Sequence, residues 1–242
     1  MSIIYGKNAV IEALKGGQPL EKVIIAQGIK PANVNAVRHE AKARNIPVRE
    51  VNRKKITEMA GHVNHQGIVA VAGEIAYRSL DYIFKVAEEK NEPPLVALLD
   101  EIQDPHNLGA IMRSAEAFGL HGIIIPKNRS VGLTDTVAKT SAGAIHHIPV
   151  ARVTNLSRTI EELKSRELWI VGADQKSEQR IHDVDLTMPL GIVVGSEGKG
   201  IRRLVREKCD FLVQIPMTGK INSLNASVAA AILFWEVCRK KI

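Results

Sequence analysis

The chain has 242 residues, a net charge of +7 and a hydrophobic content of 45%, which permits one large domain or a small domain beside a medium one. No stretch approaches the roughly 18 apolar residues of a membrane span, and the start of the chain does not follow the pattern of a signal peptide. Cys209 and Cys238 have no CxxC spacing, which argues against a disulfide or a thiolate metal site. We therefore expect a soluble, cytoplasmic protein that is not bound to a membrane.

Helix and strand patterns alternate through residues 1–74, which predicts a small α/β sandwich. In chain order the expected elements are a helix at 8–17, a strand at 21–28, a helix at 31–45, a strand at 46–52, a helix at 53–61 and a strand at 67–73. Residues 1–75 carry 11 Lys or Arg against six Asp or Glu, whereas the rest of the chain carries 22 against 20. This excess suggests that the first part contacts a polyanion, with a solvated basic surface as the alternative.

A change in pattern between residues 75 and 94 predicts a linker. One helix is expected at 80–91, and the double proline in "EPP" cannot continue it. The expected organisation is a small domain at 1–74, a linker at 75–94 and a second domain at 95–242.

Residues 95–242 again alternate between strands and helices. The expected strands are 95–100, 122–126, 146–151, 168–174, 190–198 and 211–216, and the expected helices are 107–119, 134–145, 156–166, 201–209 and 223–241. Strands separated by helices predict a mostly parallel sheet with helices on both faces, and such sheets bind ligands at the carboxyl ends of their strands.

Three polar, glycine-bearing loops follow strands of this second sheet. They begin "EIQDPHNLGAIMRS", "SEGKGIRR" and "MTGKINSLNAS". Residues such as Ser223 and Asn225 cap helices by satisfying free N–H groups at their starts, so capping alone explains one such loop. Three in one domain raise the alternative that the loops converge on one ligand.

Several familiar sites do not fit these loops. "GSEGKG" has neither the dinucleotide spacing GxGxxG nor the length and the Ser or Thr of a P-loop, and it is not the nucleophile elbow GxSxG. His106, His146 and His147 lie only loosely near acidic residues, and adjacent histidines in a strand point to opposite faces. We expect no metal.

Taken together, "DPHNLGAIMRSAEAFG", "IVVGSEGKGIRRLVREKCD" and "IPMTGKINSLNASVAAAILFWE" resemble, in order and spacing, the three motifs of the SpoU (TrmH-like) family of RNA ribose 2′-O-methyltransferases. The resemblance covers about 95–242. The first half, with "YGKNAVIEAL" and "HQGIVAV", looks like the small RNA-binding domain of that family, which is similar to ribosomal protein L30e. The arrangement is most similar to the bacterial 23S rRNA guanosine 2′-O-methyltransferases, the RlmB subfamily.

The resemblance implies a C-terminal trefoil knot of the SPOUT type and a homodimer with the site near its interface. It implies transfer of a methyl group from S-adenosylmethionine to a ribose 2′-hydroxyl, with RNA as partner, most simply a guanosine of 23S rRNA in free RNA or in a large-subunit precursor. A tRNA substrate and a non-catalytic RNA-binding or ribosome-assembly protein are the alternatives.

Carried over motif by motif, the resemblance implies a catalytic set and a cofactor set. The catalytic set is Asn107, Arg113, Glu197 and Asn225; the cofactor set is Ala173, Gly195, Ser196, Gly198, Ile215, Met217, Ser223 and Leu224. Other roles stay open: Asn107 as a helix cap, Arg113 as a solvated side chain, and Ser223 as a cap or as a partner of the ligand or of Arg113. Glu197 is expected at the start of a helix, where the dipole favours a carboxylate, and Gly195 and Gly198 suit either a bound ligand or a turn.

Overall fold

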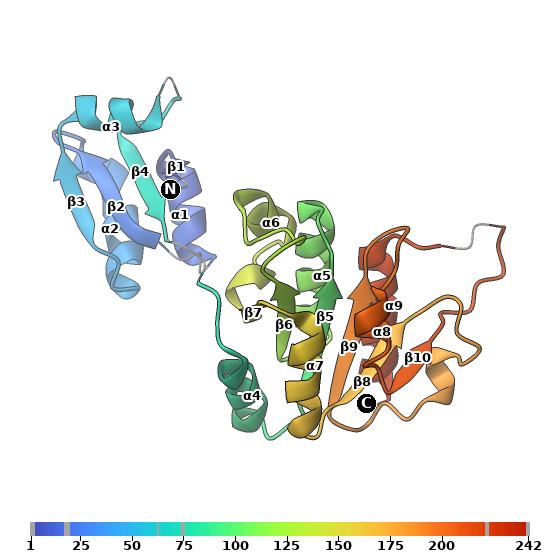
Figure 1. The fold of residues 1–242 in the computed structure, drawn as a ribbon. Helices are drawn as coiled ribbons and strands as arrows, with labels where there is room; N and C mark the ends of the chain where they lie inside the picture. The colour runs from blue at the N-terminus through green and yellow to red at the C-terminus, as the bar shows by residue number, and fades with distance from the viewer. Residues whose placement is uncertain (1–2, 17–19, 62, 74–75, 221–222, 241–242) are drawn as a thin grey trace. The chain divides into compact units, whose positions relative to one another are not determined.

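The computed structural model describes the chain except residues 1–2, 17–19, 62, 74–75, 221–222 and 241–242 (Figure 1). Contacts divide the chain into two units, Met1–Ala76 and Tyr77–Ile242, each with its own sheet. The expected domain boundary at residues 74–75, Gly17 at the end of the first expected helix, and part of the third loop lie outside the described residues.

The first unit is a four-stranded sheet with helices on both faces. Its elements are β1 (Ile3–Tyr5), α1 (Lys7–Lys15), β2 (Leu20–Ala26), α2 (Pro31–Ala43), β3 (Val48–Val51), α3 (Arg53–Ala60) and β4 (Ile68–Ala72). The strand order is β1-β4-β2-β3, in which β2 and β3 are parallel and the other pairs antiparallel. The short strand β1 was not expected from the sequence, because three residues are too few to show the alternating pattern of a strand. It is a strand because it pairs with β4.

Alternating residues of the strands divide the core of this unit into two layers. Val23 packs with Leu14 of α1 and Val37 of α2 on one face. On the other face Ile24 packs with Ile56 of α3. The first unit is therefore an α/β sandwich with its own core, as the sequence predicted.

The second unit is a six-stranded sheet with strand order β10-β8-β9-β5-β6-β7, and every strand pair is parallel. Its elements are α4 (Leu80–Glu89), β5 (Leu95–Asp100), α5 (Pro105–Ala117), β6 (Gly122–Pro126), α6 (Asp135–Thr140), η1 (Ala144–His146), β7 (Val150–Val153), α7 (Leu156–Ser165), β8 (Trp169–Ala173), η2 (Ile181–Asp183), β9 (Leu190–Gly195), α8 (Arg203–Arg206), β10 (Phe211–Val213) and α9 (Ala226–Arg239). The parallel sheet confirms the predicted α/β class. The trefoil knot stays a prediction.

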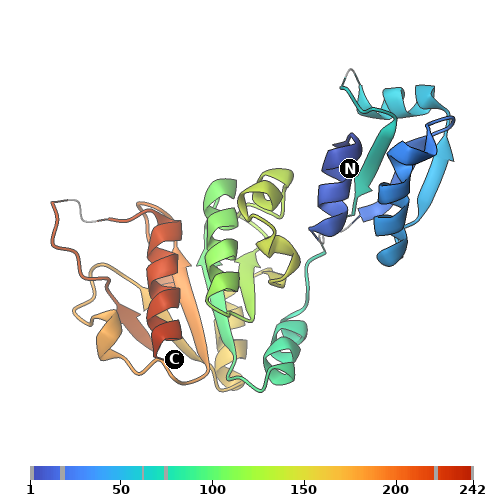
Figure 2. The same ribbon diagram turned by 180° about the vertical axis from the view of Figure 1, so that it is seen from behind.

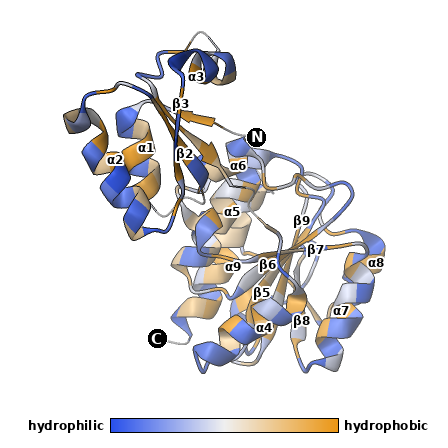
Figure 3. Ribbon diagram, turned by 90° about the vertical axis from the view of Figure 1, so that its left-hand side faces the viewer, coloured by the Kyte–Doolittle hydropathy of each residue, from blue (hydrophilic) through white to orange (hydrophobic). Residues whose placement is uncertain are grey.

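Helices cover both faces of this sheet. Figure 1 shows α7 in front of the strands, with α4 beside them, and Figure 2, from behind, shows α5 and α9 over the opposite face. Ile83 of α4 and Ile160 of α7 pack with Val96 and Leu98 of β5. Hydrophilic and hydrophobic residues alternate along α7 (Figure 3), as expected of a helix with one buried side. The residues expected to form a linker thus include a helix that packs into the core of the second unit.

Three expected elements differ from those observed. The helix expected at 134–145 ends at Thr140, because Ala142 and Gly143 adopt φ values of +49° and +96° that an α-helix does not allow, and the following strand begins only at Val150. The helix expected at 201–209 is the single turn of α8. Among the described residues no helix is both long and apolar enough to cross a bilayer.

Candidate active site

The loops after β8, β9 and β10 enclose a cavity of about 310 Å³ at the carboxyl edge of the second sheet. The three strands are neighbours and parallel, so their loops emerge side by side. A cavity at this edge suits a small-molecule ligand. The first of the expected loops, which follows β5, borders the same region, because Asn107 accepts a hydrogen bond from Asn225 of the third loop.

All eight residues expected to bind the cofactor line this cavity: Ala173, Gly195, Ser196, Gly198, Ile215, Met217, Ser223 and Leu224. The loop after β8 adds residues that were not expected, Asp174, Gln175 and Lys176, and Arg206 of α8 closes the same side. Arg206 Nε lies 2.6 Å from Asp174 Oδ2, so an ion pair ties α8 to this loop. Asp174, Gln175 and Lys176 directly follow the strand β8, and this position after a strand end is the feature of the sequence from which they could have been predicted.

One side-chain amide joins the three expected loops. Asn225 Nδ2 donates to Asn107 Oδ1 at 2.9 Å and to Glu197 Oε2 at 3.3 Å. Asn225 Oδ1 meanwhile accepts from the backbone N and the hydroxyl of Ser227, at 3.0 and 2.6 Å, and so caps α9. Because two donors occupy the oxygen, the amide nitrogen faces Asn107 and Glu197.

The structure decides between the roles left open for several of these residues. Asp104, and not Asn107, caps α5, since Asp104 Oδ1 accepts from His106 N at 2.9 Å. Asn225, and not Ser223, caps α9; Ser223 is exposed at the cavity. The expectation that Glu197 begins a helix is wrong: α8 begins only at Arg203, because a tight turn intervenes.

Arg113 does not join the other three members of the expected catalytic set within one copy of the chain. It is exposed on α5 and does not line the cavity. In the part of the chain that the structure describes, the guanidinium makes no hydrogen bond or ion pair. Asn107, Glu197 and Asn225 are brought together; Arg113 is left projecting from the helix that carries Asn107.

Gly195 is required by the shape of the second loop. A Cβ at this position would lie 2.1 Å from the carbonyl carbon of Gly200 and 2.3 Å from Ile201 N, well inside contact distance. Ser196 and Gly200 form a backbone bridge, and Gly198 and Gly200 have φ values of +82° and +67°. These glycines therefore permit the turn itself, which was the alternative to close approach of a ligand.

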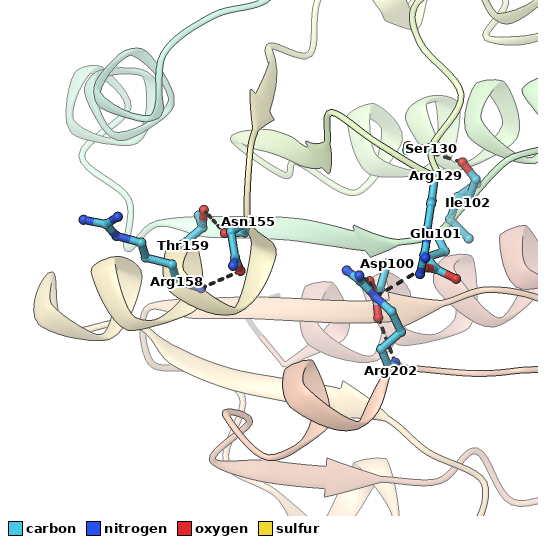
Figure 4. Close-up of polar contacts among 9 residues, drawn as sticks. All are labelled: Asp100, Glu101, Ile102, Arg129, Ser130, Asn155, Arg158, Thr159 and Arg202. Atoms are coloured by element: carbon cyan, nitrogen blue, oxygen red, sulfur yellow. Dashed lines mark hydrogen bonds and ion pairs between the residues drawn. The ribbon is translucent and has the colours of Figure 1, made fainter.

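An ion pair between a buried carboxylate and a partly exposed arginine holds this loop against β5 (Figure 4). The Asp100 side chain at the end of β5 is fully buried and accepts from Arg202 N at 2.8 Å and Arg202 Nε at 2.7 Å. The hydrogen bond that the Arg202 side chain donates to Asp100 raises the pKa of Arg202 above its ordinary value. Removing Arg202 would leave the fully buried Asp100 carboxylate without its counter-ion, so the pair fixes the loop that carries Glu197. Neither residue was singled out from the sequence.

The loop after β5 is held from its other side by the segment after β6. Arg129 NH1 lies 3.2 Å from Glu101 Oε1, and Ser130 Oγ donates to Ile102 O at 3.3 Å (Figure 4). Glu101 has a φ of +61°, a strained value for this residue.

The same figure shows Asn155 capping α7, because the Asn155 side chain accepts a hydrogen bond from Arg158 N. Among the described residues no three His, Cys, Asp or Glu side chains gather as metal ligands would.

Two family models match the chain. The SpoU rRNA Methylase family matches residues 94–235, and a model described as RNA 2′-O ribose methyltransferase substrate binding matches residues 3–78. Among curated relatives, YacO of Bacillus subtilis (strain 168), assigned to the TrmH family of tRNA/rRNA methyltransferases, is 54% identical over 98% of this chain and 95% of its own length. A TrmH family protein of Staphylococcus aureus (strain MSSA476) is 46% identical over 99% and 96%.

Solved structures share the fold over nearly the whole chain. An rRNA methyltransferase from Sinorhizobium meliloti is 26% identical with a TM-score of 0.75, covering 99% of this chain and 87% of that one. The SpoU methyltransferase AviRb from Streptomyces viridochromogenes, in complex with AdoMet, is 24% identical with a TM-score of 0.75, covering 99% and 90%. The family models span both units in the order that the sequence motifs predicted. The chain belongs to the SpoU rRNA methylase family.

Proposed function

We propose that the protein transfers a methyl group from S-adenosylmethionine to the ribose 2′-hydroxyl of an RNA nucleotide. The observation that carries the proposal is the Asn225 amide, which holds Asn107 and Glu197 together at the edge of the cavity. Three loops tied by one hydrogen-bonded side chain form a pre-organised polar site beside a cavity, which is what a transfer reaction that depends on positioning requires.

The cavity fits the proposed methyl donor chemically. Its walls combine apolar side chains, among them Val213, Ile215 and Leu224, with the charged Asp174 and Lys176. Such a lining suits a ligand with an adenine ring at one end and an amino-acid zwitterion at the other. AviRb, which has this fold, was solved with AdoMet. When bound, S-adenosylmethionine supplies the electrophilic methyl group.

The chain's own residues would position the hydroxyl and stabilise charge. Asn107 and Glu197, which Asn225 holds in place, supply oriented donors and acceptors where the 2′-hydroxyl would lie. Arg113 is a poor proton acceptor because its guanidinium stays charged in proteins. Its role in this proposal is to hold an RNA phosphate and to stabilise the alkoxide that forms as the hydroxyl loses its proton.

A homodimer would complete the site. Val228, Ile232 and Trp235 form a stripe on α9, with Val228 and Trp235 exposed to 46% and 48%. The stripe and Ala110 and Ser114 of α5 line an apolar groove. Large apolar residues exposed in a row mark an interface more often than free surface. Arg113 lies next to Ser114 in sequence, so a second copy in this groove would meet Arg113 at its border.

The first unit would hold the RNA. Its excess of basic residues favours contacts with phosphates, and the substrate-binding model covers it. We propose a guanosine of 23S rRNA, free or in a large-subunit precursor, as the target, as in the RlmB subfamily, and the cytoplasm as the location. A tRNA target is the alternative, since the relatives are described as tRNA/rRNA methyltransferases.

The direct test is methyl transfer from labelled S-adenosylmethionine to RNA, joined with mapping of ribose methylation in cells with and without the protein. The proposal expects one ribose methylation in rRNA to disappear with the protein, and the purified protein to restore it in RNA from the deficient cells. A site in tRNA would establish the alternative target. Tight RNA binding without any transfer would instead identify a non-catalytic assembly protein and overturn the proposal.

A further inference from the structure

A second cavity adjoins the one described above. It measures about 260 Å³ and lies between the first and second loops. Ser196, Glu197 and Lys199 line both cavities, so the two share a wall. The rest of the lining comes from the start of α5 and the loop before it: Glu101, Ile102, Gln103, Asp104 and Asn107. Anything bound in the second cavity therefore lies beside whatever occupies the first.

The shared wall carries the polar groups of the proposed reaction. Asn107 and Glu197 line the second cavity, and Asn225 donates to both of them. A ribose that offers its 2′-hydroxyl at these groups would thus approach from the second cavity, while the first holds the methyl donor.

The far wall carries hydrogen-bonding groups that the fold does not use. Gln103 is exposed, and its side-chain amide makes no hydrogen bond within the described part of the chain. Asp104 Oδ1 accepts from His106 N in the cap of α5, and Oδ2 makes no hydrogen bond within the described part of the chain. An amide and a carboxylate on adjacent residues can accept from and donate to the edge of a base.

The charges around the cavity suit a nucleotide. Glu101 has Arg129 NH1 at 3.2 Å and Arg202 Nε at 3.6 Å, so two cations offset its charge. Lys199 is exposed at the shared wall and has no acidic partner among the residues that the structure describes. A free cation beside the cavity suits the phosphate attached to the ribose.

We infer that this second cavity holds the acceptor nucleotide, with its ribose at Asn107 and Glu197 and its base against Gln103 and Asp104. The inference rests on the proposed function and adds the residues that would select the base. Guanine is the base that presents two adjacent N–H donors, N1–H and N2–H, and beside them an O6 acceptor for the Gln103 amide. The Asp104 carboxylate can accept both donors, one on Oδ2 and one on the second lone pair of Oδ1, while Oδ1 still caps α5. The cavity therefore selects guanosine through Asp104 and Gln103.

The test uses the full chain and an RNA transcript spanning the mapped nucleotide, carrying guanosine or inosine at that position. Inosine lacks the N2 amino group and keeps N1–H and O6. Asp104→Asn preserves the helix cap, because Asn caps as well as Asp, but replaces the carboxylate. Gln103→Ala removes the amide, and Asp185→Asn is the matched control, a carboxylate-to-amide change at an exposed residue that does not line the cavity.

We expect Asp104→Asn and Gln103→Ala to lower kcat/KM for the guanosine transcript about tenfold or more. The affinity for S-adenosylmethionine should stay within twofold, and Asp185→Asn should match the parent protein. The parent should lose about tenfold on inosine, and Asp104→Asn should lose nothing further, since the carboxylate that reads N2–H is gone.

Three results would overturn the inference alone while transfer by the parent upholds the proposed function. They are an unchanged kcat/KM in both variants, an equal inosine penalty in the parent and in Asp104→Asn, and a mapped target that is not guanosine. No transfer by the parent protein to any RNA would overturn the proposed function and this inference with it.

Discussion

Asn225 serves two purposes with one side-chain amide. Its oxygen caps α9 and its nitrogen donates to Asn107 and Glu197. The two purposes can be separated, because an aspartate at the same position can still accept from Ser227 N but cannot donate when ionised. The residue thus allows the fold of the site to be tested apart from its chemistry.

We predict that Asn225→Asp keeps a stability close to that of the parent and loses methyl transfer at least 100-fold, because the donor is gone and a second carboxylate faces Glu197. Asn225→Ala should lose transfer and also about 1 kcal/mol of stability with the cap. Urea unfolding and initial rates at saturating S-adenosylmethionine measure the two effects. Parental rates from Asn225→Asp would show that the amide is only a cap.

Cys209 is a partly buried thiol whose pKa follows from its surroundings. Burial, and secondly the nearby Asp210 carboxylate, raise the pKa of this thiol to about 12 from an ordinary 9.0. The folded state thus favours the neutral thiol. The neutral Cys209 thiol therefore contributes to the free energy of unfolding below about pH 9, and this contribution is lost as the pH rises toward 12. The reason is that the Cys209 thiol ionises at a lower pH in the unfolded chain than in the folded protein.

In a Cys238→Ser protein, a disulfide reagent at pH 8 should therefore react with Cys209 at least 100-fold more slowly than in the urea-unfolded chain, since the thiolate is the reactive form. Labelling of the native protein at the unfolded rate would mean that the thiol is neither buried nor neutral.

At the scale of elements, α5 and α6 are packed through a glycine. A Cβ on Gly109 would lie 1.9 Å from Thr140 Oγ1 and 3.0 Å from Ser141 N. Replacing glycine by alanine in the middle of a helix normally stabilises by about 1 kcal/mol. Here the added methyl group would force the two helices apart, at a cost of about 1–3 kcal/mol.

We predict that Gly109→Ala lowers the free energy of unfolding and reduces transfer, because α5 also carries Asn107 and Arg113. Thermal and urea unfolding show whether the free energy of unfolding falls or rises. Glu116→Ala, a change at an exposed position of the same helix, is the control for the effect of helix propensity. An increase in stability for Gly109→Ala would contradict the close packing of α5 and α6.

Most strands could be predicted from the sequence, because buried parallel strands such as 95–100 and 190–195 are almost continuous apolar runs, and such short runs are typical of strands that are covered on both faces. Helix ends were predicted less well: the helix expected at 134–145 stops early because Ala142 and Gly143 take positive φ values that periodicity does not reveal. The lining of the first cavity could be predicted because motif residues follow strand ends. The ion pair of Asp100 with Arg202 could not, since its two members are far apart in the chain.

At the scale of the whole molecule, the two units divide naturally after Ala76. Residues 1–76 have their own core on both faces of a sheet, and α4 contributes Ile83 to the core of the second unit. A separable catalytic half should therefore begin at residue 77 and include α4, rather than begin at residue 95.

We predict that a 77–242 fragment stays folded, binds S-adenosylmethionine within threefold of the parent and loses at least tenfold in RNA affinity, because the basic unit is gone. A 95–242 fragment should be less stable, since it exposes the surface that α4 covers. Calorimetry and RNA binding at two salt concentrations measure these effects. Undiminished RNA binding by 77–242 would refute the division of roles.

The central claim is that two copies of the chain build one RNA methylation site. Arg113 is exposed on α5, does not line the cavity of its own copy and precedes Ser114 of the apolar groove, whereas Glu197 lines the cavity and is linked to Asn107 through Asn225. If Arg113 serves the partner's cavity, two different defects can compensate when they lie on different copies.

The measurement is methyl transfer to RNA by an Arg113→Ala protein and a Leu224→Trp protein, each alone and after unfolding and refolding them together. Leu224→Trp fills the cavity and should abolish cofactor binding, and Arg113→Ala should bind cofactor normally but transfer nothing. The refolded mixture should recover about a quarter of the parental activity, because mixed dimers hold one intact cavity facing one intact Arg113. Activity that stays absent in the mixture, although mixed dimers form, would contradict the shared site, and substantial transfer by Arg113→Ala alone would contradict the role given to Arg113.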